Sequence, residues 1–191
     1  MSNRLQGYFD YASATPLDSR VLATMSPFFS LDFYNPSALY SAADSSKEAI
    51  AKARRQLASE LGVRHTEIIF TSGCSEANNM AIHGIMRANP GAKVLISAIE
   101  HESVRQTAYQ YNYAEVPISS VGVVDLDVLE KMITDDVVLV SIMYINNEIG
   151  TVQPLRRAAE IIAKIRKARG PKGKPIYLHS DAAQAPNVRT I

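Results

Sequence analysis

The stretch Val137-Val-Leu-Val-Ser-Ile-Met-Tyr-Ile145 is continuous, uncharged and rich in β-branched side chains. Such a run is typical of a strand that is buried on both faces of a parallel sheet. Helical patterns lie on either side of it, over residues 125–133 and 155–168. Strands that alternate with helices in this way predict a mostly parallel sheet covered by helices, so we expect an α/β fold.

The same alternation extends outward along the chain in both directions. Pro16 is well placed to open a helix that runs to about residue 29, and Gly62 is well placed to end the next helix. We interpret residues 35–37 as a turn, with Ser37 as a cap of that second helix. Further strands are expected at residues 68–70, 94–97, 114–118 and 176–180, and further helices at residues 75–88 and from residue 101.

The composition is that of an ordinary globular protein. Of 191 residues, 47% are hydrophobic and 20% are charged, and the formal net charge is +1. These values argue against disorder and against a disulfide scaffold. The small net charge gives no broad attraction to nucleic acid or to a membrane surface, so neither is expected as a partner. A basic stretch at residues 156–174 has no interleaved aromatic side chains, and we interpret it as a solvated surface.

The single cysteine, Cys74, has no second cysteine with which to form an internal disulfide, which suits a reducing, cytoplasmic compartment. Residues 1–8 show no basic region followed by an apolar stretch, so no signal peptide is expected. The longest apolar run, at residues 137–145, is too short to span a bilayer.

Four polar clusters follow predicted strands within about three residues of the strand ends. Ligands of open α/β sheets bind beyond the carboxyl ends of the strands, so these clusters are the candidate functional residues. The clusters are Thr71–Glu76, Glu100–Glu102, Asn146–Gly150 and Asp181–Gln184.

The first cluster is small, polar and glycine-containing, and it opens a helix. Free backbone N–H groups and the helix dipole make such a turn a phosphate site, but any tight strand-to-helix loop is built in the same way. Neither a dinucleotide fingerprint nor a P-loop is present. The helix N-terminus could lower the pKa of Cys74, but we favour its interpretation as a small residue lining the turn.

Four residues of the other clusters are candidates for holding a ring. Asp181 follows a strand that is expected to be buried, so its carboxylate needs a partner such as a protonated heteroaromatic nitrogen; the alternative is a helix cap. His101 begins a helix, where it could stack on a planar ring or move a proton, although a lone histidine is more often structural. Asn147 and Gln184 could hold a ring oxygen or a substrate carboxylate, or merely satisfy turns.

Six segments of the sequence together resemble the cysteine desulfurases, which are pyridoxal-phosphate enzymes of the class V aminotransferase group. The resemblance runs from about residue 8 to residue 187, and its Asn-Asn-Glu-Ile-Gly and Asp-Ala-Ala-Gln motifs are specific. It implies a three-layer α/β/α fold like the large domain of fold type I transferases, incomplete at the carboxyl end. In that scheme residues 1–15 are a segment for small-domain or dimer contacts, and residues 16–191 are a partial cofactor domain. The segments are Phe9–Pro16, Asn35–Ser37, Ile69–Asn78, Glu100–His101, Val140–Gly150 and His179–Gln184.

The resemblance also implies roles for six residues at the cofactor, pyridoxal 5′-phosphate, and no metal. Cys74 and Ser75 match the positions at the phosphate. His101 matches the catalytic histidine that stacks on the ring and takes part in proton transfer. Asp181 matches the aspartate that pairs with the ring nitrogen. The two amides complete the set: Gln184 lies near the phenolic oxygen, and Asn147 lies near that oxygen and the substrate carboxylate.

The activity that the resemblance implies is conversion of L-cysteine to L-alanine, with the sulfur left as an enzyme persulfide for sulfur-acceptor or scaffold proteins of iron–sulfur assembly. The family is generally homodimeric. Its Schiff-base lysine and its persulfide cysteine have no counterpart in this sequence, so we expect the chain alone to be inactive. Two alternatives stay open: a non-catalytic short paralogue or partner subunit, and another class V enzyme such as a selenocysteine lyase or an aminotransferase.

Overall fold

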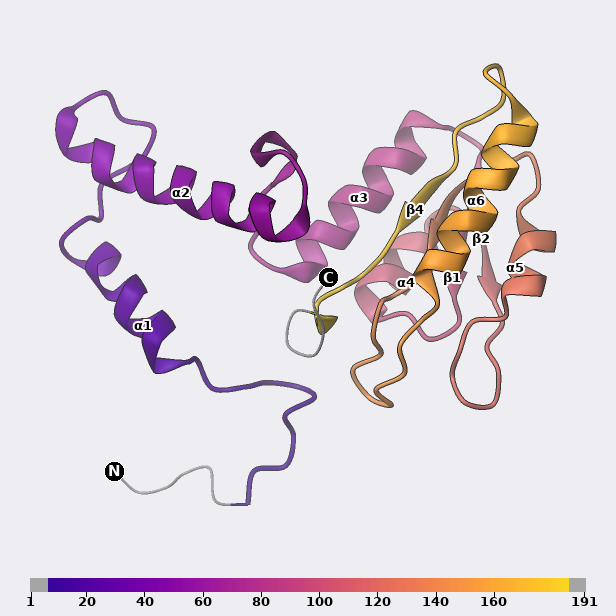
Figure 1. The fold of residues 1–191 in the computed structure, drawn as a ribbon, viewed down its shortest axis with the longest axis horizontal. Coiled ribbons are helices and arrows are strands. Elements are labelled where there is room, and N and C mark those ends of the chain that lie inside the picture. Colours follow the sequence, from indigo (N-terminus) through magenta and orange to yellow (C-terminus); the bar gives the residue numbers. More distant parts are fainter. Residues whose placement is uncertain (1–6, 186–191) are drawn as a thin grey trace. The chain divides into compact units, whose positions relative to one another are not determined.

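The computed structural model describes residues 7–185 (Figure 1). The chain divides into two compact units, one that ends at Phe70 and one that begins at Thr71. The boundary between residues 15 and 16 that the family resemblance implies stays a prediction. Within the described residues, no helix is long and apolar enough to cross a membrane.

The first unit consists of helices and turns. Its first helix begins at Ser19 and not at Pro16, because the Asp18 carboxylate caps it by accepting a hydrogen bond from the backbone N–H of Arg20 at 2.8 Å. Gly62 ends the long helix as predicted, in the left-handed conformation with φ of 64°. The elements are α1 (Ser19–Met25), η1 (Ser26–Phe29), η2 (Ser41–Ala43), α2 (Asp44–Leu61) and η3 (His65–Glu67).

Two predictions in the first unit are wrong. Ser37 does not cap α2, which begins at Asp44; its backbone N–H instead donates to the side chain of Asn35 at 2.9 Å, within the predicted turn. Residues 68–70 form no strand, because no strand among residues 7–185 pairs with them. Ile69 and Phe70 are 65% and 46% exposed, so their apolar character does not reflect a place in a sheet.

The second unit confirms the α/β fold with a parallel sheet. Its four strands are β1 (Lys93–Ser97), β2 (Asn112–Val116), β3 (Val137–Ser141) and β4 (Tyr177–His179). They lie in the order β2-β1-β3-β4, and every neighbouring pair is parallel. The helices are α3 (Cys74–Ala88), α4 (Glu102–Ala108), α5 (Leu126–Met132) and α6 (Leu155–Arg169).

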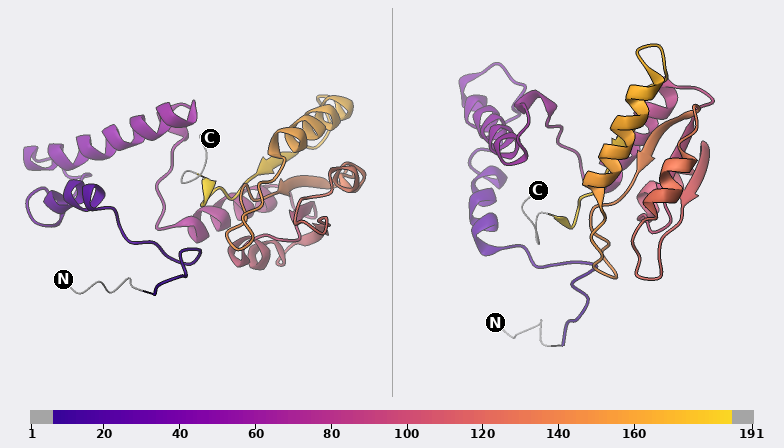
Figure 2. Two further views of the ribbon diagram at one scale, coloured as in Figure 1. Left: turned by 60° about the horizontal axis from the view of Figure 1, so that its bottom comes forward. Right: turned by 45° about the vertical axis from the view of Figure 1, so that its right-hand side comes forward.

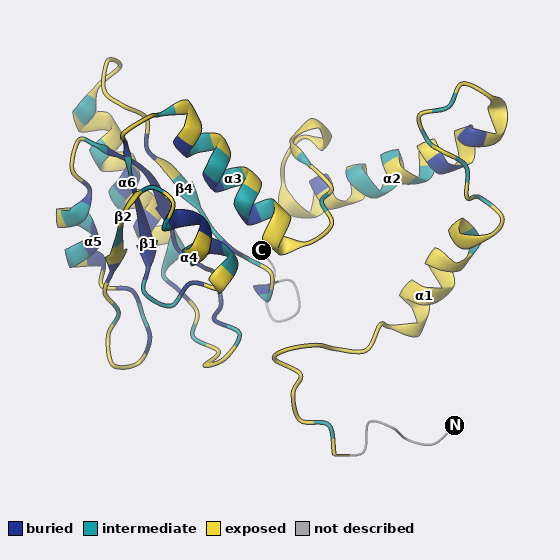
Figure 3. Cartoon of the chain, turned by 180° about the vertical axis from the view of Figure 1, so that it is seen from behind, coloured by how far each residue is buried: buried dark blue, intermediate teal, exposed yellow. Residues whose placement is uncertain are grey.

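Helices cover both faces of this sheet, so the unit has three layers (Figures 1 and 2). On one face, α5 and α6 pack on Leu95 and Val140; on the other, α3 and α4 pack on Val94 and Ile96. In the burial colouring of Figure 3 the two central strands, β1 and β3, are mainly dark blue, whereas β2 and β4 at the sheet edges are largely exposed or intermediate. β1 and β3 contribute side chains to the core on both faces of the sheet, because side chains along a strand alternate between its two faces.

The carboxyl ends of the four strands meet at one edge of the sheet because all the strands are parallel. β3 ends four residues before the predicted end, at Ser141, which is its last residue that pairs with β1 and with β4. The chain then forms a loop closed by an antiparallel bridge between Ile145 and Val152. Three of the four polar clusters, those at residues 100–102, 146–150 and 181–184, therefore follow β1, β3 and β4 at a single edge.

Candidate functional site

The carboxylate of Asp181 is the centre of the site. It follows β4, is 7% exposed, and receives hydrogen bonds from three donors. Its Oδ1 accepts from the Cys74 thiol at 3.3 Å and from the backbone N–H of Ala183 at 3.0 Å. Its Oδ2 accepts from Nδ2 of Asn78 at 2.9 Å. Each carboxylate oxygen accepts about two hydrogen bonds, so within residues 7–185 Oδ2 keeps one position for a further donor.

The charge of Asp181 is stabilised despite its burial. Burial by itself would raise the pKa of this carboxyl group. The hydrogen bonds from Asn78, the Ala183 N–H and Cys74 act in the other direction, and so does the nearby His179. The pKa of Asp181 consequently lies below its ordinary value, and the group is an anion at neutral pH. It is suited to hold a cationic donor in its remaining position.

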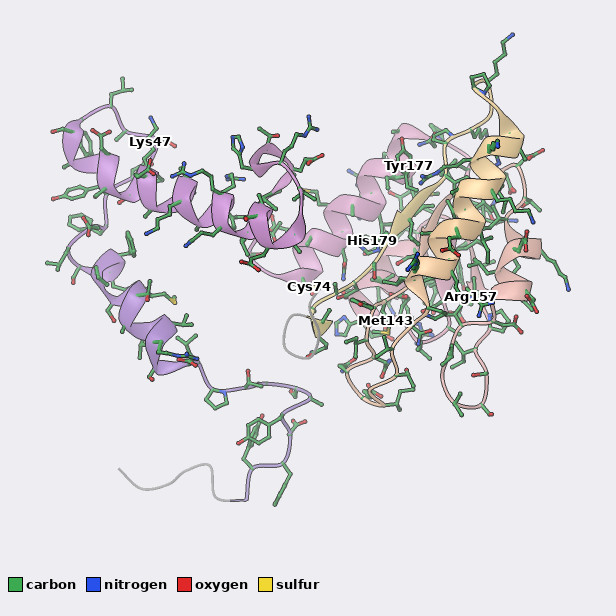
Figure 4. All side chains as sticks on the ribbon, viewed as in Figure 1. Lys47, Cys74, Met143, Arg157, Tyr177 and His179 are labelled. Atoms are coloured by element: carbon green, nitrogen blue, oxygen red, sulfur yellow. The ribbon has the colours of Figure 1, made fainter. Side chains whose placement is uncertain are left out.

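Cys74 is the first residue of α3, and its side chain lies where that helix begins (Figure 4). Its pKa is raised from 9.0 to about 11, mainly by burial and then by the hydrogen bond to the Asp181 carboxylate and by that group's charge. The helix dipole could lower this pKa, but burial and the neighbouring carboxylate together raise it. The thiol is a hydrogen-bond donor and not a nucleophile at neutral pH.

This raised pKa predicts slow thiol chemistry. At about pH 8 the thiolate fraction of Cys74 is expected to be about 100-fold smaller than that of an ordinary cysteine, and its reaction with a disulfide reagent correspondingly slower. Because the chain has one cysteine, the rate can be read from a colorimetric disulfide reagent without labelling ambiguity. The chain unfolded in urea is the control. Equal rates in the folded and unfolded chain would contradict the hydrogen bond of the thiol to the Asp181 carboxylate and the raised pKa of Cys74.

His101 occupies the position before α4, as the sequence predicted, and it caps that helix. Its Nδ1 accepts from the backbone N–H of Ser103 at 3.1 Å and lies 2.8 Å from the hydroxyl of Ser103. Asn78 Nδ2 also donates to that hydroxyl oxygen, at 2.9 Å. A continuous chain of hydrogen bonds therefore connects His101 to Asp181 through Ser103 and Asn78.

A cavity of about 390 Å³ lies beside this network. It is lined by residues 98–102, Arg105 and residues 146–149, so His101 and Asn147 share its wall. The structure thus brings together residues that follow two different strands, β1 and β3, as expected for the carboxyl edge of a parallel sheet. Among residues 7–185, no group of three or more His, Cys, Asp or Glu side chains could hold a metal ion.

Glu100 is a buried acid on the same wall, and it is 5% exposed. Its Oε1 accepts from the Ser97 hydroxyl at 2.7 Å and from the backbone N–H of Met143 at 2.6 Å. Its Oε2 has no hydrogen-bond partner within the described residues. Burial raises the pKa of Glu100 to about 7, against the two hydrogen bonds, and the charge of Asp181 adds to the rise.

Three predicted site residues, Ser75, Asn147 and Gln184, lie near the site but take no part in the hydrogen bonds that connect His101 to Asp181. Ser75 lies in the first turn of α3, where its carbonyl accepts from the Asn79 amide at 2.8 Å. Gln184 is half-buried in the turn after Asp181. The side chains of Ser75, Asn147 and Gln184 make no hydrogen bond to another residue in the range 7–185. Their roles stay predictions.

Sequence reasoning missed Asn78 and Ser103, which link the site. Asn78 carried a signal, because Asn78, Ile82 and Met86 recur at helical spacing on the buried face of α3. An amide in an apolar stripe requires a polar partner. Ser103 carried a weaker signal: a hydroxyl two residues after a histidine at a helix start is placed to bond its ring.

Comparison with known proteins gives the family. A family model described as aminotransferase class-V matches residues 7–190. The chain is 39% identical over 187 residues to a cysteine desulfurase IscS of Clostridium botulinum, covering 94% of this chain and 45% of that protein. It is 42% identical over 189 residues to a mitosomal cysteine desulfurase of Trachipleistophora hominis, covering 93% of this chain and 40% of that protein.

Solved structures agree. A NifS-like protein superposes with a TM-score of 0.84 at 32% identity, over 91% of this chain and 48% of that one. SspA in complex with cysteine superposes with a TM-score of 0.84 at 34% identity, over 93% of this chain and 51% of that one. The chain spans about half the length of these relatives. Since the family model matches nearly the whole sequence, the chain belongs to the class-V aminotransferase family.

Proposed function

We propose that the protein carrying this chain is a pyridoxal 5′-phosphate-dependent cysteine desulfurase, which converts L-cysteine to L-alanine and keeps the sulfur as an enzyme-bound persulfide. The observation that carries the proposal is the Asp181 carboxylate, which is buried, anionic and open to one more donor at Oδ2. A protonated pyridine nitrogen is a donor of the right kind. The similarity to cysteine desulfurases supports the choice of reaction.

The fit of this chain to the cofactor rests on the carboxyl edge of the sheet and the start of α3. Asp181 would hold the ring nitrogen in its protonated form. The first turn of α3, with the backbone N–H groups of Cys74 and Ser75 and the Ser75 hydroxyl, would hold the phosphate. The Glu76 carboxylate accepts from the backbone N–H of Ser72 at 2.6 Å and so fixes the turn that leads into this helix.

The chemistry divides between the cofactor and the chain. When bound, the protonated ring supplies an electron sink for bond breaking in the amino acid. His101 would stack on the ring and move protons, since its side chain is exposed at the cavity wall. Asn147 and Gln184 would orient the phenolic oxygen and the substrate carboxylate. We assign no sulfur chemistry to Cys74, because its thiol is held protonated by burial and by Asp181.

The proposed partners follow from the same reaction. L-Cysteine is the substrate, and a solved relative is described as a complex with cysteine. Sulfur-acceptor or scaffold proteins would remove the persulfide sulfur, and we propose a homodimer in the cytoplasm. The single cysteine supports a reducing compartment.

The test is product formation by the protein that carries this sequence, purified from its own cells and loaded with pyridoxal 5′-phosphate. L-Cysteine is expected to yield L-alanine and a persulfide in equal amounts. L-Selenocysteine and L-alanine with a keto acid are the comparison substrates. Turnover of selenocysteine alone, or transfer of an amino group alone, would replace the proposed reaction by another class V activity.

A further inference from the structure

We propose that Asn78 and Ser103 are positioning residues that hold His101 in the tautomer with its proton on Nε2 and couple that tautomer to the Asp181 carboxylate. The inference deepens the proposed function, because the role of His101 in proton transfer rests on that proposal. The contacts that fix the tautomer lie within the polypeptide chain, so the tautomer can be tested without the cofactor and independently of the proposed function.

The first step is the direction of the Asn78 amide. The Asp181 carboxylate only accepts hydrogen bonds, so the group of Asn78 that faces its Oδ2 at 2.9 Å must be the NH2. Asn78 is 2% exposed and cannot turn to water instead. The second N–H of the same NH2 group then points at the Ser103 hydroxyl oxygen, at 2.9 Å.

The second step is the direction of the Ser103 hydroxyl. Its oxygen accepts from Asn78, so its hydrogen is available for the nearest acceptor. That acceptor is Nδ1 of His101, which lies 2.8 Å away. One N–H of Asn78 therefore donates to Asp181, while its other N–H and the Ser103 hydroxyl both donate in the direction of the histidine.

The third step is the histidine ring. The backbone N–H of Ser103 lies 3.1 Å from Nδ1 of His101, and a backbone N–H can only donate. Two donors, one from the main chain and one from the hydroxyl, therefore meet at Nδ1. A ring nitrogen that accepts carries no hydrogen, so the proton of the imidazole resides on Nε2. The structure thus assigns Nε2 as the atom of the neutral His101 ring that carries the hydrogen and can donate it in a hydrogen bond.

The experiment reads the tautomer directly in the full chain without cofactor. Long-range nitrogen–proton correlation spectra of chain labelled with ¹⁵N-histidine distinguish the two neutral tautomers, and a His101→Gln spectrum identifies the His101 signals. We expect the Nε2–H pattern for His101 at about pH 8.5. A predominant Nδ1–H pattern would overturn the proposal.

Ser103→Ala removes the hydroxyl donor and leaves the backbone donor. We expect the ratio of Nε2–H to Nδ1–H tautomer to fall about five- to tenfold, the effect of one neutral hydrogen bond, and Ser103→Thr to restore it. His83, which has its own contact with Tyr111 at 2.6 Å, is the internal control and should not change. An unchanged ratio in Ser103→Ala, or equal ratios in the alanine and threonine variants, would remove Ser103 from the role.

Asn78 is tested in the unaltered chain, because replacing a buried amide also risks the fold. Both of its N–H bonds are engaged, so its side-chain protons should exchange with solvent much more slowly than those of the exposed Asn112. Equal exchange rates would contradict the link. The expected tautomer and exchange results, together with no formation of alanine from L-cysteine by the purified protein, would contradict the proposed function but support the hydrogen-bond network from Asp181 to His101.

Discussion

Asp181→Asn is expected to weaken the binding of pyridoxamine 5′-phosphate to this chain by about 10- to 100-fold, because a hydrogen bond to a charged acceptor becomes one to a neutral amide. Pyridoxamine 5′-phosphate is the appropriate probe since it carries the same ring and phosphate and needs no lysine for attachment. Isothermal titration of the two chains measures the difference. Asn keeps the size of the side chain, so the comparison reports charge more than packing.

The same substitution has a second, independent consequence at Cys74. The hydrogen bond to Asp181 and the charge of that carboxylate both raise the pKa of the thiol, so their removal is expected to lower it and to speed thiol labelling. The pKa should remain above 9.0, since burial is the largest cause of the rise.

Asp125→Asn serves as the matched control for both measurements. Asp125 caps α5 by accepting from the backbone N–H groups of Asp127 and Val128, each at 3.0 Å, and asparagine is an equally good cap. This variant should leave both the affinity for pyridoxamine 5′-phosphate and the thiol reactivity as they are. Unaltered affinity in Asp181→Asn would mean that the carboxylate does not hold the ring nitrogen.

The sequence predicted the second unit well because its signals are local. An uncharged β-branched run marks β3, and the acidic residue Asp125 marks the start of α5. The strand predicted at residues 68–70 failed for a nonlocal reason: a short apolar run becomes a strand only when another strand pairs with it. The end of β3 depended likewise on where its pairing with β1 and β4 stops.

The site was predicted to the level of its clusters and not of its contacts. Cys74 and Asp181 were both candidates, but nothing in the sequence indicated that residues 107 positions apart would share a hydrogen bond. Burial and that contact together raise the pKa of the thiol, which the helix dipole could have lowered. Asn78 was recognisable only as an amide in an apolar stripe, and besides Cys74 its partners come from the start of α4 and from the segment after β4.

Glu100 gives the second large effect, a loss of stability as the pH rises. Its pKa is about 7 in the folded chain against 4.5 as the ordinary value. A carboxyl group whose pKa is raised by folding favours the folded state most below its unfolded pKa, and this contribution disappears as the pH rises through the folded pKa. The shift corresponds to about 3 kcal/mol of unfolding free energy, present below about pH 4.5 and lost above about pH 7.

Other groups near Glu100 titrate differently, so the wild-type profile alone does not isolate it. Burial lowers the pKa of His179, so its contribution to the unfolding free energy has the opposite pH dependence. This contribution is present above about pH 6.5 and is lost as the pH falls. Asp181 has a lowered pKa and stays charged across this range. The difference between the wild type and a Glu100 variant at each pH cancels both terms.

Glu100→Gln is the variant that isolates the effect, because glutamine resembles the protonated acid. Its carbonyl oxygen can accept from the Ser97 hydroxyl and the Met143 N–H, and its NH2 replaces the Oε2 that has no partner within residues 7–185. The variant is expected to match the wild type at about pH 4 and to be more stable by about 3 kcal/mol at about pH 8. Guanidinium unfolding followed by circular dichroism gives both values. Glu102 is exposed and lies two positions further along the chain, so the stability of Glu102→Gln relative to the wild type should not change with pH. A difference in stability between Glu100→Gln and the wild type that stays constant over this pH range would mean that Glu100 is ionised in the folded chain throughout.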